Sequence, residues 1–414
     1  MKEAILERFL RYVAVTSQSD GKAGVVPSSE GQRKLAGMLA DELAELGFVN
    51  IEISEYSVLT ALLPGNLPDN KAVPTVGWCC HLDTVDAGLS PDIHPQVIRG
   101  YQGGDICLNK DKDLWMRTSE HPEIEKYVGD DIVVTDGTSV LGADNKSAIA
   151  NVMTAFDVVV KENRPHGDIY VAFVPDEEIG LLGAKKIDFS KFPVDFAYTV
   201  DCCELGEVVY ETFNAGSATI RIKGVTAHPM SSKGVLVNPT LIATDFVQMM
   251  DRGSTPECTE GTEGFVWVNS IVSNPSRATV SIKIRDHNRE KYEAKKALIA
   301  SAVEYLKVRH PRAEIELDVK DMYGNIADAL TNDNRCAVDH LYRALEIAGV
   351  KANTIAMRGG TDGSFISTQG ILTPNYFTGG HNFHSNCEFL PLGAAVKSTE
   401  VTLTLIDLIA GTKH

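Results

Sequence analysis

The sequence lacks the patterns that mark several classes of protein. Its eight cysteines include no CxxC pair and are too scattered over 414 residues for a disulfide framework, which argues against thiolate zinc fingers. No apolar run approaches membrane-spanning length, and the first residues lack the apolar core of a signal peptide. A formal charge of −17 disfavours nucleic acid and anionic membranes, which both attract basic surfaces. We therefore expect a soluble, cytoplasmic protein that has neither as a partner.

The residues that are present indicate a globular protein with an α/β sheet. Hydrophobic residues make up 43% of the chain and charged residues 23%, which is ordinary for a folded protein of two or three domains. Strands expected over 51–63, 73–80, 168–174 and 196–200 alternate with helices, and this order predicts an open, mostly parallel sheet. The polar, irregular stretch 95–131 is expected to be a long surface loop or a hairpin insertion.

Residues 211–324 follow a different pattern. Strands expected at 217–224, 264–272, 278–285 and 313–319 enclose helices at 238–251 and 289–308 in the order β-α-β-β-α-β, which is the ferredoxin-like arrangement. We interpret this segment as a domain inserted into a discontinuous first domain formed by 1–210 and 325–414. The exposed edge strands of such an insertion can pair with a second copy, so a homodimer is one expectation.

Acidic residues follow the end of the apolar strand 168–174. Three carboxylates, Asp176, Glu177 and Glu178, are adjacent there, and their mutual repulsion raises a pKa unless a metal ion keeps them ionised. The next polar groups also follow strands: His81 and Asp83 come after 73–80 and Asp201 after 196–200. Ligands of open α/β sheets bind beyond the carboxyl ends of the strands, so these residues are expected to share one rim.

Two further residues complete this group. Asp144 lies where a loop meets a helix, a position that also suits a helix-capping aspartate. His384 follows a double glycine, and His381 competes with it for the same role. The set taken for the centre contains two histidines and five carboxylates, namely His81, Asp83, Asp144, Glu177, Glu178, Asp201 and His384. This mixture suits Zn, Mn or Co, and the absence of thiolate favours a catalytic over a structural site.

The motifs around these residues resemble a known family. His-Leu-Asp-Thr (81–84), Gly-Ala-Asp-Asn-Lys (142–146), Asp-Glu-Glu-Ile-Gly (176–180) and Gly-Gly-His-Asn-Phe-His (379–384) look like those of the co-catalytic dizinc exopeptidases, which include peptidase T, carboxypeptidase G and aminoacylase. The stretches 101–105, 134–144, 233–238 and 358–362 are similar to the tripeptide aminopeptidase subgroup. The likeness covers essentially the whole chain. Asn145 departs from it, since many relatives carry a second aspartate there.

The resemblance implies a role for each residue of the centre. Asp144 bridges two metal ions, most often Zn²⁺. His81 and Asp201 hold one ion, and Glu178 and His384 hold the other. Asp83 orients His81 without touching metal, and Glu177 acts as general base on a water molecule.

In the inserted domain, the resemblance implies that His228 donates to the scissile carbonyl oxygen and that Arg285 and Arg358 clamp the carboxylate of the peptide. The apolar–polar alternation of strand 278–285 places Arg285 on the polar face, so a solvent-exposed side chain without a binding role is the alternative. Gly359-Gly360 also permits a phosphate-binding loop, but the chain has no GxxxxGK[ST] motif.

These observations predict a metal-dependent aminopeptidase that removes the N-terminal residue from short peptides, with tripeptides as the expected substrates. A related dizinc carboxypeptidase, dipeptidase or N-acyl amino acid deacylase is the alternative within the same class. A metal-binding protein without catalysis is the alternative from another class, and the presence of Glu177 beside every expected ligand argues against it.

Overall fold

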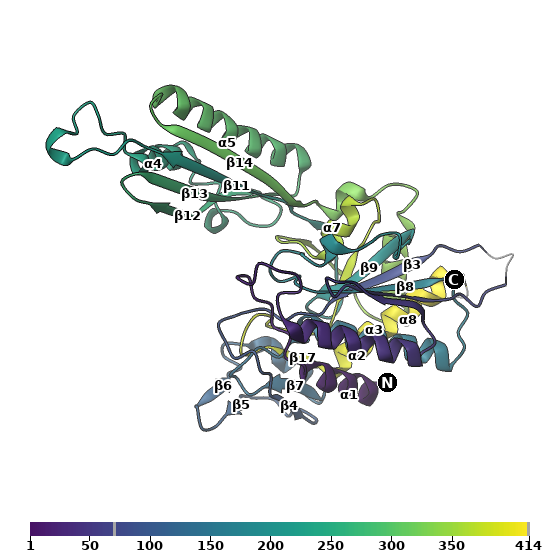
Figure 1. Ribbon diagram of the computed structural model, residues 1–414. Coiled ribbons are helices and arrows are strands. Elements are labelled where there is room, and N and C mark those ends of the chain that lie inside the picture. The colour runs from purple at the N-terminus through teal and green to yellow at the C-terminus, as the bar shows by residue number, and fades with distance from the viewer. Residues whose placement is uncertain (69–71, 412–414) are drawn as a thin grey trace. The chain divides into compact units, whose positions relative to one another are not determined.

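The computed structural model describes residues 1–68 and 72–411, and these form two compact units. The first unit contains Met1–Tyr210, Ala329–Ile355 and Thr361–His414, and the second contains Glu211–Asp328 and Ala356–Gly360 (Figure 1). Residues 325–328 and 356–360 thus belong to the second unit, whereas the sequence pattern placed all of 325–414 in the first. None of the helices in the described part of the chain has the length and apolar character needed to cross a lipid bilayer.

An eight-stranded sheet forms the centre of the first unit, in the order β1-β2-β8-β3-β9-β16-β10-β15. Its strands are β1 (Val49–Ile53), β2 (Leu59–Leu63), β3 (Val76–His81), β8 (Ile169–Val174), β9 (Phe196–Cys202), β10 (Glu207–Thr212), β15 (Asn353–Met357) and β16 (Asn375–Phe377). The four strands β8, β3, β9 and β16 are parallel neighbours, while β2 and β10 join this group antiparallel. The largely parallel sheet expected from the sequence is confirmed; β10 and β15 were not predicted.

Helices cover this sheet because their apolar residues recur on one face. They are α1 (Lys2–Val13), α2 (Glu30–Glu45), α3 (Ala143–Lys161), α6 (Cys336–Ile347), α7 (Asp362–Thr368) and α8 (Leu392–Ile409). The central helix, α3, contacts β3 and β9 as well as α1 and α8. Its Phe156 meets the buried Trp78 of β3 edge-on, with 6.0 Å between ring centroids. This ring contact packs the second half of α3 against β3.

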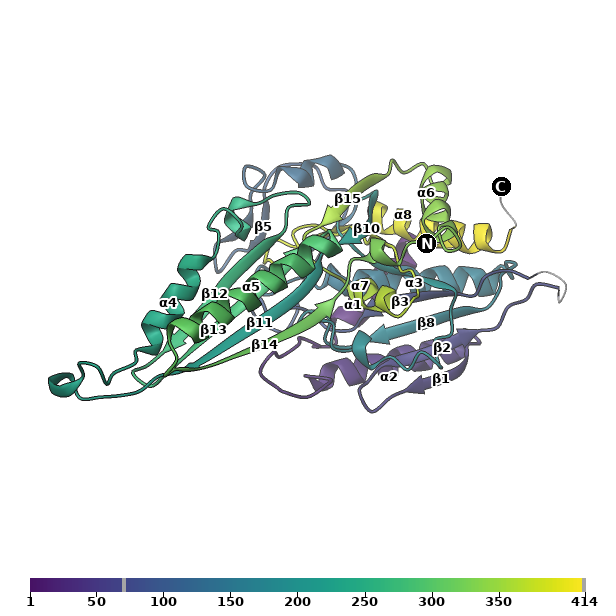
Figure 2. The same cartoon turned by 90° about the horizontal axis from the view of Figure 1, so that it is seen from above.

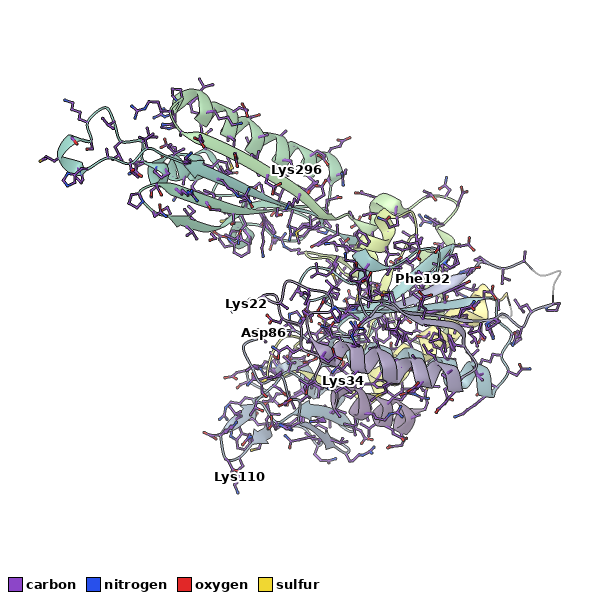
Figure 3. All side chains as sticks on the ribbon, in the orientation of Figure 1. Lys22, Lys34, Asp86, Lys110, Phe192 and Lys296 are labelled. Carbon is purple, nitrogen blue, oxygen red and sulfur yellow. The ribbon has the colours of Figure 1, made fainter. Side chains whose placement is uncertain are left out.

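Residues 95–135 form a small subdomain of the first unit rather than a plain surface loop. It contains β4 (Pro95–Ile98), the hairpin β5 (Ile106–Asn109) and β6 (Leu114–Met116), the 3₁₀ helix η1 (Pro122–Tyr127) and β7 (Ile132–Thr135). β7 pairs with β4 and with β17 (Phe389–Pro391), and the hairpin turns near Lys110 (Figure 3). Its own core includes Tyr101, Ile124 and Phe389. The hairpin expectation is correct; the loop alternative is wrong because short apolar strands here bury a separate core.

The second unit is a four-stranded antiparallel sheet with two helices on one face. Its strands, in the order β12-β13-β11-β14, are β11 (Asn214–Lys223), β12 (Phe265–Ser273), β13 (Arg277–Asp286) and β14 (Glu314–Tyr323). The helices are α4 (Pro239–Met249) and α5 (Arg289–Arg309), and both contact β13 (Figure 2). The element order is β-α-β-β-α-β, as the alternation of the sequence predicts.

Candidate metal centre

The carboxyl ends of three neighbouring parallel strands position most of the centre. His81 is the last residue of β3, Asp201 is the next to last of β9, and Glu177 lies three residues after β8. Since β8, β3 and β9 are adjacent and parallel, their ends meet at one edge of the sheet. The start of α3 brings Asp144 to the same edge. The residues expected at one rim are therefore brought together.

Asp144 lies between two groups of side chains. Its Oδ1 is 2.9 Å from His81 Nε2, and the same histidine nitrogen is 3.6 Å from Asp201 Oδ1. Its Oδ2 is 3.1 Å from His384 Nε2, which is 3.0 Å from Glu178 Oε1. The ligand atoms of His81, Asp144 and Glu178 all lie within 4.8 Å of one another. One carboxylate thus faces a histidine–aspartate pair on one side and a histidine–glutamate pair on the other.

The electrostatics of these residues favour positive charge at the centre. Burial alone lowers the pKa of His81, but hydrogen bonds to Asp144 and Asp201 outweigh it and raise that pKa well above its usual value. Hydrogen bonds to Asp144 and Glu178 raise the pKa of His384 to about 10. Two divalent cations supply the same positive charge, and imidazole with carboxylate is a donor set that such cations accept. The residues therefore fit a pair of divalent ions.

The two glutamates of the centre hold their protons tightly. Burial raises the pKa of Glu178 to about 8, and the negative charge of Asp144 contributes to the same shift. Burial also raises the pKa of Glu177 well above its usual value, with Asp201 and Glu178 adding like charge. Among the described residues, no side chain or backbone group forms a hydrogen bond with the Glu177 carboxylate. This carboxylate remains available for proton transfer.

Asp83 supports the centre through contacts with His81 and with the backbone of Glu177 and Glu178. Its Oδ1 accepts a hydrogen bond of 3.0 Å from the backbone N–H of Glu177, and its Oδ2 accepts one of 3.2 Å from that of Glu178. Its Oδ1 also lies 3.3 Å from His81 Nδ1, the nitrogen that faces away from Asp144. One buried carboxylate therefore orients the ring of His81 and the backbone of both glutamates.

Replacing Asp83 with asparagine is expected to weaken metal binding by about 10-fold to 100-fold. The amide keeps one acceptor oxygen but turns an N–H towards a backbone N–H, so one of the two glutamate contacts is lost. Zinc titration of the chelator-treated protein measures the change. Asp86→Asn is the control, because Asp86 is exposed and, within the described part of the chain, accepts only from the backbone N–H of Gly88 (Figure 3). Equal zinc affinity in the two variants would contradict a supporting role for Asp83.

Glu388 is a supporting residue that the sequence analysis missed. Its Oε2 accepts from the backbone N–H groups of Leu141 (2.6 Å) and Gly142 (3.0 Å), and its Oε1 accepts from that of Asp144 (3.1 Å). Burial raises the pKa of Glu388 to about 7. This carboxylate holds the loop that presents Asp144. The Glu-Phe pair after His384 was visible in the sequence, but nothing in it indicates contact with a loop more than 240 residues away.

Two residues that stand out in the sequence, Asp176 and Asn145, have specific contacts in the structure. Asp176, the first acid of the triplet, turns away from the centre and accepts hydrogen bonds from Ser28 and Gln32. Its positive φ of 57° separates it from the two glutamates that follow. Asn145, the departure from the family pattern, donates to Asp201 Oδ1 at 2.6 Å and so restrains that side chain.

The structure distinguishes between His381 and His384, the two histidines that were candidates for the same role. His381 Nε2 lies 2.6 Å from the hydroxyl of Tyr127, and its ring stacks on Phe389 with a centroid distance of 4.7 Å. His384 is the one whose Nε2 faces Asp144 and Glu178. The structure therefore places His384, and not His381, beside the acidic residues.

The predicted substrate-binding residues all lie in the second unit. His228 is exposed, and its Nδ1 accepts from the backbone N–H of Met230 at 3.2 Å. Arg285 is half-buried rather than solvent-facing, because it donates to the carbonyls of Gly216 and Ile284 and lies over the ring of Tyr323.

Arg358 lies over two aromatic rings, 5.3 Å from the centroid of Phe213 and 5.6 Å from that of Phe265. It donates to the carbonyl of Glu263 at 2.8 Å and to Thr259 Oγ1 at 2.8 Å. A Cβ on the neighbouring Gly360 would come within 2.4 Å of the Tyr323 ring. Packing against this tyrosine accounts for that glycine without a phosphate-binding loop.

Comparisons with known proteins agree with this geometry. The model of peptidase family M20/M25/M40 matches residues 142–408. A peptidase T-like protein of Yersinia pestis is 52% identical over 98% of this chain and 97% of its own length. Peptidase T of Caldanaerobacter subterraneus is 40% identical over 98% of each chain. The crystal structure of an aminopeptidase PepT from Bacillus cereus shares the fold, with a TM-score of 0.76 over 99% of each chain at 22% identity.

Proposed function

This chain belongs to peptidase family M20/M25/M40 and is a metal-dependent peptidase, and we propose that it removes the N-terminal residue from tripeptides. The observation that carries the mechanism is the position of Asp144, whose two oxygens face His81 and His384 separately. A carboxylate between two such groups suits a bridge between two ions. The peptidase T relatives support the tripeptide as substrate.

We assign the ligands of the two ions from the distances. His81 and Asp201 would hold one ion, Glu178 and His384 would hold the other, and Asp144 would be shared by both. Zn²⁺ is the proposed metal because imidazole and carboxylate without thiolate match its catalytic sites. When bound, such a pair of ions lowers the pKa of water and neutralises the negative charge that develops on the carbonyl oxygen.

Glu177 is the proposed general base. Its raised pKa and its lack of a hydrogen-bonding partner among the described residues suit a group that accepts and returns a proton. It takes a proton from the attacking water and later donates it to the nitrogen of the leaving amine. Asp83 keeps Glu177 in place through the backbone N–H, so the base moves only its side chain.

The second unit is proposed to supply contacts to the rest of the peptide. His228, which is exposed, donates to the scissile carbonyl oxygen, and Arg285 and Arg358 bind the peptide carboxylate. A guanidinium has five N–H donors, so each arginine keeps donors beyond those committed to its neighbours. Packing over aromatic rings holds both groups in fixed orientations.

We also propose that the protein is cytoplasmic and that two copies pair through an edge strand, β12 or β14, of the second unit. Trp267, Ile271 and Val272 of β12 are exposed, and an apolar edge strand is a pairing surface.

Related carboxypeptidases, dipeptidases and deacylases share a centre of this kind, so the choice among them depends on how the substrate's ends are bound.

A substrate panel tests the proposed function. The zinc-loaded and metal-stripped proteins are each given a free tripeptide, its N-acetylated form, its C-terminal amide and the matching dipeptide, and the products are identified by mass spectrometry. We expect zinc-dependent release of the N-terminal residue, with loss of activity on the acetylated form and weak activity on the amide and the dipeptide. Release of the C-terminal residue or of the acetyl group would instead identify a carboxypeptidase or a deacylase.

A further inference from the structure

The loop that carries His384 needs support from outside itself. The side chain of His384 is 48% exposed, whereas that of His81 is 1% exposed at the end of a central strand. His384 and Asn382 both have positive φ values, 63° and 55°, so the local backbone is not part of a helix or strand. A ligand in such a loop is placed precisely only if neighbouring elements hold the loop.

One element that contacts this loop is η1 (Pro122–Tyr127), the short 3₁₀ helix of the 95–135 subdomain. Asn382 Nδ2 donates to Glu123 Oε1 at 2.7 Å and lies 3.2 Å from His121 Nδ1. The same nitrogen donates to the carbonyl of Cys387 at 3.2 Å, which closes the loop on itself. Asn382 therefore ties the loop both to its own far end and to the subdomain.

A second contact joins the other end of η1 to the same loop. The hydroxyl of Tyr127 lies 2.6 Å from His381 Nε2, within hydrogen-bonding distance. Burial lowers the pKa of His381 to about 4, so the ring is neutral, and a hydroxyl and a neutral imidazole can each donate or accept. The His381 ring is parallel to Phe389, which belongs to β17 and to the core of the subdomain. The residues two and three positions before His384 are thus held by Glu123 and Tyr127.

We propose that the 95–135 subdomain is part of the metal centre's support, with Glu123 and Tyr127 as residues that position His384 through its loop. Loss of these contacts lets His384 move, so the ion shared by His384 and Glu178 binds more weakly, while the ion held by His81 and Asp201 is little affected. This inference rests on the ligand assignment of the proposed function. It gives a role to a segment for which the sequence alone indicates none.

Zinc binding to the full-length, chelator-treated protein tests the proposal directly, by equilibrium titration that resolves two sites. For Glu123→Ala we expect one of the two ions, the one shared by His384 and Glu178, to bind about 10-fold less tightly, the effect typical of a residue that orients a ligand. The affinity of the other ion and the melting temperature of the metal-free protein stay as in the wild type. Glu125→Ala is the matched control, because Glu125 is exposed and lies on the same 3₁₀ helix.

A charge exchange gives a second, independent readout. Asn382→Asp places a carboxylate against Glu123 and is expected to weaken the same ion at least as much as Glu123→Ala. Combining Asn382→Asp with Glu123→Gln restores a donor–acceptor pair, because the new amide donates to the new carboxylate. Affinity should return to within a few-fold of the wild type, with a small residual loss from the missing Cys387 contact.

The outcomes separate the two proposals. If the wild type binds fewer than two ions, the ligand assignment of the proposed function is wrong. If the wild type binds two ions and Glu123→Ala binds them equally well, the positioning role is wrong and the proposed function stands. If Glu123→Ala does not fold, the comparison of Asn382→Asp with the double variant decides, and absence of rescue overturns the positioning role.

Discussion

The Glu177→Gln variant is expected to lose about 10³-fold in kcat, within the range that a general base contributes, while it still binds two divalent ions. Glutamine has nearly the same shape but its amide does not accept the proton of water. The backbone N–H of residue 177 still donates to Asp83, and no side-chain hydrogen bond of Glu177 is lost among the described residues. The fold and the metal content should therefore be unchanged.

Steady-state hydrolysis of a tripeptide, with metal content measured on the same samples, tests this expectation. Glu178→Gln is the informative comparison, because Glu178 faces His384 and is a proposed ligand. That variant should lose activity together with one ion, whereas Glu177→Gln loses activity alone. A Glu177→Gln variant that kept its kcat would exclude Glu177 as the base, and one that lost an ion would make Glu177 a ligand.

The Asp144→Ala variant is expected to lose tight binding of both ions and, with it, detectable activity. Asp144 is the one carboxylate that contacts both histidines of the centre, at 2.9 Å and 3.1 Å. Loss of a direct ligand to both ions should weaken binding by more than about 100-fold, the upper range for residues that only orient a ligand. The metal-free protein should remain folded, because His81 still has Asp201 as a partner and His384 still has Glu178.

Thermal melting with and without zinc measures this effect without reference to activity. A ligand that binds only the folded state raises the melting temperature, so zinc should stabilise the wild type but not Asp144→Ala. Asp41→Ala is the control: Asp41 is an exposed aspartate of α2, and its variant should keep the zinc-dependent shift. An equal shift in Asp144→Ala would contradict the bridging assignment.

Local patterns in the sequence were sufficient to predict most of the secondary structure and the position of most of the centre. Period-2 alternation in residues 278–285 predicted β13, and the run ending at Cys80 predicted β3. The strands β10 and β15 were missed because polar or charged residues leave only a short apolar run in each. The same limitation hid the strands of the 95–135 subdomain.

The proposed metal ligands could be found from the sequence because topology brings the ends of parallel strands to one edge of the sheet. His81, Glu178 and Asp201 are therefore close in space although they are far apart in the chain. These residues could be recognised as candidate ligands by their type, because histidines, aspartates and glutamates have few other reasons to gather at the ends of apolar strands. The motif around Asp144 added the one residue that lies on a helix rather than on a strand.

Only the tertiary structure decided which residues hold those ligands in place. Glu388 reaches the backbone of Asp144, and Glu123 reaches the loop of His384, across sequence separations of 244 and 259 residues. Asp176 stands beside the glutamates in sequence but turns to α2 in space. The sequence by itself determined the chemistry and the strands that carry it. The supporting contacts depend on how distant loops pack, and no local pattern records that packing.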